Sequence, residues 1–347
     1  LAAGLAGSVL TAGLLTALGG LDEDAPARPA VVRQVSAPVR PSSTGRADVV
    51  GIAEEVGPAI ARIDVEGETD ASGSGVLFRD DGYLLTNAHV VEGADRITAV
   101  LADASELEGE VVGADRLTDI AVVKVNRGAP LPTAALGSAA GLRVGEVAIA
   151  IGSPLGLTGG SSVTTGVVSA VGREVESEDG STLLDMVQTD AAISPGSSGG
   201  ALLDGSGVVV GITTAIAVSE VGAEGLGFAT PIDIAQSVAE EIIESGRAVH
   251  VWLGVQGEDL DADSARDLGV DGGALVERVV DDSPAATAGI ERGDVILAAG
   301  GEEVASMSAL VIALRHRRPG DGIELDVVRD GARSTMAVTL EERPAGR

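Results

Sequence analysis

The sequence contains no cysteine, which excludes disulfide frameworks, thiol nucleophiles and thiolate metal sites. Aromatic side chains are nearly absent as well, since among 347 residues there are two Phe, one Tyr and one Trp. Any core must therefore consist of Val, Ile, Leu and Ala, and the first two of these favour strands. The length leaves room for about two folded domains and a tail.

Basic residues are also scarce. The chain has 23 Lys and Arg against 53 Asp and Glu, and its formal net charge is −30. Such a surface repels nucleic acid, so we expect no nucleic-acid partner and instead expect neutral or cationic polypeptides. Lys124 is the sole lysine, and this preference for Arg is typical of a GC-rich or salt-adapted source.

Only three histidines, His89, His250 and His316, could serve as a general base. They do not have the spacing of a metal site, so we expect no metal and no cofactor. His89 follows an apolar run after an Asp-Asp-Gly turn, which predicts a strand that delivers the imidazole at its end. His250 follows a predicted helix and His316 lies in a basic cluster, and we expect both to be ordinary surface histidines.

Residues 195–203, Pro-Gly-Ser-Ser-Gly-Gly-Ala-Leu-Leu, place two serines between glycines. Glycines let the backbone turn sharply and aim several N–H groups at one point, where the negative oxygen of a tetrahedral intermediate could bind. A serine hydroxyl is a weak nucleophile by itself and needs a base. Taken alone, such a stretch is more often a flexible turn than a catalytic loop.

Asp119 begins the β-branched run 120–125 and is the best candidate for an orienting carboxylate. We expect it to be buried, where an unpaired charge is costly. Pairing with His89 would remove that cost and fix the tautomer of the imidazole. Aspartate at the start of a strand is also a common turn former, and a lone histidine is often structural.

The order His89, Asp119, Ser198 is that of chymotrypsin-like double barrels, whereas subtilisin and the α/β-hydrolases use other orders. Residues 86–91, 118–125, 189–200 and 225–231 resemble the HtrA/Deg serine proteases, and the likeness extends over roughly residues 48–341.

The sequence departs from the family pattern at Ser194 and Ser197, where Asn is usual. The resemblance assigns the nucleophile to Ser198, which directly precedes the glycine pair. It also implies an oxyanion hole made by the backbone N–H groups of Gly196 and Ser198.

The resemblance implies an all-β, chymotrypsin-like double β-barrel at residues 48–247. The residues favour the same fold, because short strands alternate with glycine-bearing turns. The likeness continues at residues 251–341, where the Leu-Gly-Val stretch at 253–255 and residues 283–296 resemble a PDZ domain, a small α+β fold.

In a PDZ domain the C-terminus of a peptide adds as a strand beside a helix, and backbone N–H groups hold its carboxylate. Leu253, Gly254 and Val255 occupy the matching position here. The groove helix is expected at residues 306–316, with Leu310 and Leu314 in its apolar stripe. The same stripe could simply be core.

Side-chain preference follows from position within the fold that the resemblance implies. The residue six before the nucleophile, Ala192, is expected at the floor of the substrate pocket, with Ile193, Ile212 and Phe228 as its walls. Without a carboxylate there, a buried Arg or Lys would stay unpaired. We therefore expect cleavage after small or medium aliphatic residues.

Residues 1–21 carry no charge and are long enough to span a bilayer. We expect a single-pass anchor in the cell membrane, with a cleaved signal peptide and a secreted protein as the alternative. Residues 22–47 are rich in proline and lack apolar periodicity, so we expect a disordered linker. The catalytic part would then be extracytoplasmic.

The favoured interpretation is an endopeptidase that degrades unfolded or damaged extracytoplasmic proteins and is regulated or targeted by its PDZ domain. One alternative is a chaperone or scaffold of the same fold without proteolysis, and another is a protease with one narrow signalling substrate. The resemblance further implies a homotrimer, although the aromatic residues that often form the family's trimer contacts are missing near the start of the protease domain.

Overall fold

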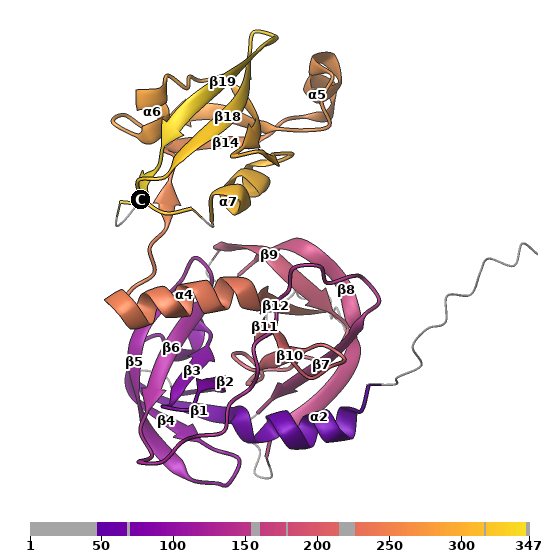
Figure 1. Ribbon diagram of the computed structural model, residues 1–347, viewed down its shortest axis with the longest axis vertical. Coiled ribbons are helices and arrows are strands. Elements are labelled where there is room, and N and C mark those ends of the chain that lie inside the picture. The colour runs from indigo at the N-terminus through magenta and orange to yellow at the C-terminus, as the bar shows by residue number, and fades with distance from the viewer. Residues whose placement is uncertain are drawn as a thin grey trace, which may run out of the picture. The chain divides into compact units, whose positions relative to one another are not determined.

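The structure, a computed structural model, describes residues 47–67, 70–153, 160–177, 180–214, 226–315 and 317–344. In this part of the chain two closed β-barrels of six strands each precede a smaller α+β module (Figure 1). The expected membrane segment at 1–21, the linker up to residue 46, and His316 lie outside the described residues. No helix within these ranges is long and apolar enough to cross a membrane.

The first barrel closes because β1 pairs with both β2 and β4, in the strand order β1-β2-β3-β6-β5-β4. Its strands are antiparallel and rich in Val, Ile and Leu, whose side chains pack well on a pleated surface. The strands are β1 (Ile60–Gly67), β2 (Ala71–Arg79), β3 (Tyr83–Thr86), β4 (Ala94–Val100), β5 (Glu106–Asp115) and β6 (Ile120–Val125).

The second barrel has the order β10-β11-β12-β9-β8-β7 and also closes, through the pair of β7 with β10. Its strand β8 is 15 residues long. It pairs with β7 along its first half and with β9 along its second, and register shifts let it bend between the two. The strands are β7 (Val147–Gly152), β8 (Ser162–Glu176), β9 (Thr182–Thr189), β10 (Ala201–Leu203), β11 (Val209–Thr214) and β12 (Gly227–Pro231).

One aliphatic core extends through both barrels. Helix α4 (Ile232–Ser245) covers it with Ile234, Val238 and Ile242, three residues on one helical face. The helix ends at Gly246, which adopts the left-handed conformation that glycine tolerates. The shorter helix α2 (Val49–Val56) and the 3₁₀ turn η1 (Gly57–Ala59) pack on the same core.

The C-terminal module has its own apolar core. Its main sheet has the order β14-β15-β16-β18-β19, with β17 beside β16, and β13 pairs separately with β20. Helix α6 begins after Ser283, which accepts a hydrogen bond from the Ala286 N–H, and has Pro284 in its first turn. The elements are β13 (Val251–Trp252), β14 (Val255–Asp259), α5 (Ala262–Leu268), β15 (Ala274–Val279), α6 (Pro284–Ala288), β16 (Val295–Ala299), β17 (Glu302–Glu303), α7 (Met307–Arg315), β18 (Gly322–Arg329), β19 (Ala332–Thr339) and β20 (Glu341–Glu342).

Candidate active site

His89 and Asp119 are in direct contact in the first barrel. The imidazole Nδ1 lies 2.8 Å from one carboxylate oxygen of Asp119 and 3.0 Å from the other. The backbone N–H of His89 donates to the same carboxylate at 3.1 Å. The Asp119 side chain is 8% exposed, whereas that of His89 is 45% exposed. The buried carboxylate thus has its expected partner, and the imidazole remains accessible.

The expectation that His89 ends a strand is wrong in detail. Strand β3 ends at Thr86, and His89 lies on the single-turn helix α3 (Ala88–Val91) that follows. The turn forms here because the Ala88 N–H and the Asn87 side chain both donate to the backbone carbonyl of Asp119. These bonds draw the chain away from the sheet and toward the aspartate.

The backbone of Asp119 has φ +55°, a left-handed conformation that costs energy for any residue except glycine. The side chain of Asn87 holds it there with a 2.9 Å bond from Nδ2 to the Asp119 carbonyl. The same Nδ2 donates to Thr214 Oγ1 in the second barrel at 3.0 Å. Sequence reasoning did not single out Asn87, although an amide two residues before a candidate base was a usable signal.

Ser198 lies on the loop between β9 and β10 and is 6% exposed. Its backbone carbonyl accepts a 2.7 Å bond from the Ser74 N–H of strand β2. A Cβ atom at the adjacent Gly73 would lie 3.2 Å from the Ser198 carbonyl oxygen and 2.6 Å from Val90, on the helix of His89. The serine loop of the second barrel therefore packs beside the helix that carries the histidine.

The glycines around Ser198 adopt the conformations for which glycine is needed. Gly196 has φ +87° and Gly199 has φ +84°, both in the left-handed region. At Gly199 a Cβ atom would lie 2.1 Å from the Ser74 carbonyl oxygen and 2.3 Å from Thr86 Oγ1. The sharp turn expected from the sequence is present, and it is enclosed by residues of the first barrel.

The four residues expected to form the specificity pocket have different surroundings. Ala192 is exposed, and its carbonyl accepts a bond from Thr164 Oγ1. Ile193 packs partly buried against the second barrel's own apolar cluster. Ile212 is buried in the core that extends through both barrels, whereas Phe228 packs with a separate pair of residues, Leu183 and Met186. The pocket stays a prediction.

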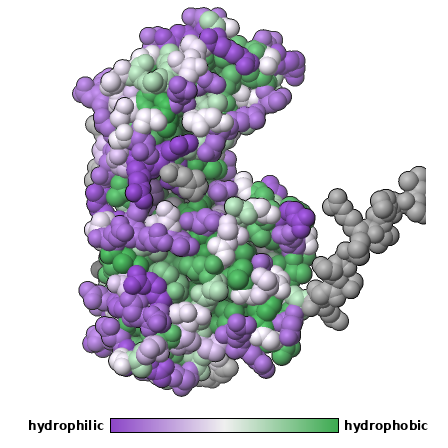
Figure 2. All heavy atoms as spheres, viewed as in Figure 1, coloured by the Kyte–Doolittle hydropathy of each residue, from purple (hydrophilic) through white to green (hydrophobic). Residues whose placement is uncertain are grey.

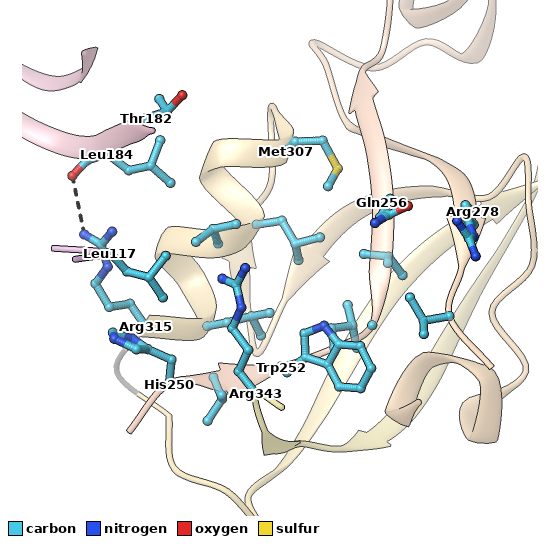
Figure 3. Close-up of a pocket in the computed structure, with 18 of the residues that line it drawn as sticks. Leu117, Thr182, Leu184, His250, Trp252, Gln256, Arg278, Met307, Arg315 and Arg343 are labelled. Carbon is cyan, nitrogen blue, oxygen red and sulfur yellow. Dashed lines mark hydrogen bonds between the residues drawn. The ribbon is translucent and has the colours of Figure 1, made fainter. Parts of the chain in front are cut away.

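A cavity of about 780 Å³ lies along the expected peptide groove (Figure 3). The loop residues Leu253, Gly254 and Val255 line it, together with Leu310 and Leu314 of α7. The side chains of Leu253, Leu310 and Leu314 also belong to the buried core of the module. These side chains therefore line the cavity and also form core, and peptide binding along the helix stays a prediction.

Gly254 has φ +87°, and a Cβ atom there would lie 2.2 Å from the Cβ of Ser283. The loop is tied down on both sides of this glycine. The Leu253 carbonyl accepts a bond from the Ala285 N–H, and the Gly254 carbonyl accepts one from the Val280 N–H. Only glycine can occupy this close approach.

His250 is not an ordinary surface histidine. It is half-buried, and its Nε2 lies 2.9 Å from a carboxylate oxygen of Asp115, at the end of β5. Burial alone would raise the pKa of Asp115, but the bonds from His250 and Thr118 lower it below its ordinary value. The same carboxylate binds the Thr118 hydroxyl and N–H, directly before Asp119.

Arg315, at the end of α7, is a second half-buried polar residue of this region. Its guanidinium donates to the Leu184 carbonyl at 3.5 Å, the dashed line in Figure 3. Burial lowers the pKa of Arg315, although Asp185 and Asp115 act in the opposite direction. Arg278 and Arg343 also line the cavity, as do the acidic residues Asp281 and Asp282. Within the described ranges no group of three or more His, Cys, Asp or Glu residues could hold a metal ion.

Residues 73–212 match the family of trypsin-like peptidase domains, and residues 251–340 match the family of PDZ domains. A relative in Pseudomonas savastanoi named "Probable periplasmic serine endoprotease DegP-like" is 43% identical over 289 residues, which are 83% of this chain and 59% of that protein. A relative of the same name in Halomonas elongata is 42% identical over 80% of this chain and 58% of its own length. The chain thus spans about three-fifths of the length of these curated relatives.

Solved structures extend the comparison. The HtrA-type protease AlgW with a tripeptide is 38% identical, with a TM-score of 0.75, and the match covers 85% of this chain and 97% of that one. The serine endoprotease from Yersinia pestis is 31% identical, with a TM-score of 0.65 over 85% of this chain and 98% of its own. In both, the likeness includes the barrels as well as the C-terminal module, so this chain belongs to the HtrA-type serine proteases with a PDZ domain.

Proposed function

We propose that this protein is a serine endopeptidase that hydrolyses peptide bonds of unfolded or damaged extracytoplasmic proteins. The observation that carries the proposal is the 2.8 Å contact between His89 Nδ1 and the buried Asp119 carboxylate. Such a pair fixes the tautomer in which Nε2 can accept a proton. In this proposal the catalytic domain spans residues 48–247 and the PDZ domain spans residues 251–341.

In the proposed mechanism Ser198 Oγ attacks the carbonyl carbon of the scissile peptide bond. His89 accepts the hydroxyl proton as the C–O bond forms and gives it to the leaving amine as the C–N bond breaks. Asp119 orients His89 and stabilises the imidazolium. The N–H groups of Gly196 and Ser198 stabilise the oxyanion, and water then hydrolyses the acyl-enzyme by the same route.

The triad is tested with an unfolded protein such as casein and with fluorogenic peptides. Ser198→Ala is expected to abolish turnover, and Asp119→Asn to lower kcat by about 10⁴-fold because it favours the wrong histidine tautomer. Asp95→Asn, an exposed aspartate of the same barrel, is the control. Melting temperatures near that of the wild type must accompany the losses. Casein cleavage that persists in Ser198→Ala would refute the assignment and leave the chaperone or scaffold interpretation.

The extracytoplasmic location rests on the relatives, two of which are named periplasmic. The preference for small aliphatic side chains rests on Ala192, which supplies no carboxylate. Mass spectrometry of the fragments from an unfolded protein tests this preference, since a profile dominated by cleavage after Arg or Lys would contradict it. Membrane anchoring through residues 1–21 is tested by fractionation of cells that produce the chain with and without this segment.

We further propose that the PDZ module binds C-terminal peptides in the groove beside Gly254. AlgW, a structural neighbour, is described with a tripeptide and with a decapeptide. Gly254→Ala places a methyl group against Ser283 and is expected to weaken binding of a C-terminal peptide by at least tenfold. Gly289→Ala is the control, since it has a similar φ of +81° but open space around its Cβ. A C-terminally amidated peptide should bind neither variant nor wild type.

Homotrimer formation is a separate proposal. Helix α2 leaves Val50 69% exposed, beside a mostly apolar hollow that Val49, Ala53, Ile151 and Val163 help to line. Figure 2 shows that exposed apolar residues are intermixed with polar ones on the visible face of the barrels. Light scattering after size exclusion should give three times the chain mass, and Val50→Asp is expected to reduce it. A monomer at micromolar concentration would contradict the proposal.

A further inference from the structure

Ser74 is a fully buried polar residue of the first barrel that the mechanism above does not use. It lies on β2 between Gly73 and Gly75 and is 0% exposed. Its hydroxyl oxygen accepts a 2.8 Å bond from the Ser153 N–H and donates a 2.8 Å bond to the Gly196 carbonyl. One hydroxyl therefore links the end of β7 to the loop that carries Ser198.

The backbone of Ser74 holds a second carbonyl of the same loop. Its N–H donates to the Ser198 carbonyl at 2.7 Å. Gly196 and Ser198 are the two residues whose own N–H groups form the proposed oxyanion hole. The carbonyl of Ser197 between them is held by Thr213 Oγ1 of β11 at 2.6 Å. Three consecutive carbonyls thus have fixed partners, and Ser74 supplies two of them.

The side-chain bond matters most at Gly196. This residue has φ +87° and no side chain, so little except its hydrogen bonds determines the direction of its peptide groups. The Gly196 carbonyl lies in the peptide plane that joins Gly196 to Ser197, and the Gly196 N–H lies in the plane before it. When the Ser74 hydroxyl holds this carbonyl, one of the two planes that meet at the Gly196 Cα is fixed, which narrows the directions that the Gly196 N–H can take. An oxyanion hole works only when its donors are already aimed at the developing charge.

We infer that Ser74 is a positioning residue, whose hydroxyl orients the oxyanion hole by holding the Gly196 carbonyl. It touches no reacting atom, and it acts through Gly196. The inference rests on the proposed hydrolytic function. It means that the oxyanion hole, whose donors belong to the second barrel, depends on a residue of the first barrel.

The test is Ser74→Ala in the full chain, with a fluorogenic peptide substrate. We expect kcat to fall about 10- to 100-fold with KM unchanged, which is less than the loss of a whole oxyanion donor. Affinity for a peptide boronic acid, whose tetrahedral adduct places an oxygen in the hole, should fall by the same factor. The acidic side of the pH–rate profile should not move, because the contact between His89 and Asp119 is untouched.

Val76→Ala is the matched control, because Val76 is buried two residues further along β2 and has no bond to the loop. If Ser74→Ala fails to fold, Ser74→Cys carries the test. A thiol donates hydrogen bonds weakly, so kcat and boronate affinity should each fall at least threefold at constant KM. The inference is overturned if the folded serine variant keeps its kcat and boronate affinity, or if Val76→Ala shows the same losses. A wild type as inactive as Ser198→Ala would overturn the proposed function, and this inference with it.

Discussion

Substitution of Gly199 by alanine tests directly how tightly the nucleophile loop is built. Gly199 follows Ser198, has φ +84°, and faces the first barrel. The added Cβ would lie 2.1 Å from the Ser74 carbonyl oxygen, whereas real Cβ contacts stay beyond 3.0 Å. The loop and strand β2 must therefore separate by about 0.9 Å, the difference between these two distances.

Two costs add up in this variant. Alanine in a left-handed conformation costs about 1–2 kcal/mol, and overpacking of a tight contact costs a further ~1–3 kcal/mol. The free energy of unfolding should fall by their sum, about 2–5 kcal/mol. A displacement of this size also misplaces the hydroxyl of Ser198, and a misplacement of about 1 Å lowers turnover by roughly 10²-fold.

The assay compares kcat/KM for a peptide substrate and the melting temperature in Gly199→Ala, in Gly205→Ala and in the wild type. Gly205 is a fitting control, because a Cβ atom there would meet its nearest neighbours at 3.7 Å and 3.8 Å. We expect the control to stay within twofold of the wild type. A Gly199→Ala enzyme with normal melting and normal kcat/KM would refute the packing described for this loop.

Two further predictions concern buried carboxylates outside the triad. Arg329 donates two hydrogen bonds, at 2.6 and 2.7 Å, to the fully buried Asp294, and Arg329→Ala removes both. Calorimetry should therefore show that the PDZ module melts several degrees lower. Arg333→Ala, at an exposed arginine, is the control. The pKa of Asp115 is lower in the folded protein than its ordinary value of 3.8, so its stabilising effect is present above that pH and is lost as the pH falls below it. Asp115→Asn should therefore lower the melting temperature at pH 6. It should also reduce the fall in melting temperature between pH 5 and pH 3. Asp271→Asn is the control, and an identical fall in the two variants would contradict the prediction.

Much of the site could be predicted because each candidate residue lies in a short sequence pattern that indicates its chemical role. A serine among glycines, a histidine after an apolar run and an aspartate before one each have a recognisable setting, and their order along the chain indicates the fold. The specificity residues were harder to predict, because Ile212 and Phe228 turned out to pack in separate apolar clusters. Their hydrophobicity gave no information about which cluster each would join.

The amino-acid sequence by itself determined the aliphatic composition of the cores, the positions where the chain must turn, and which side chains could act as nucleophile, base and orienting acid. Only the tertiary structure decided that Ser74 holds Gly196, 122 positions away, that Asn87 holds Asp119 in a left-handed conformation, and that His250 pairs with Asp115. The reason is that these contacts depend on how two barrels close and pack. A hydrogen bond between distant residues forms only when many strand pairings have fixed both ends, and no short stretch of sequence records that outcome.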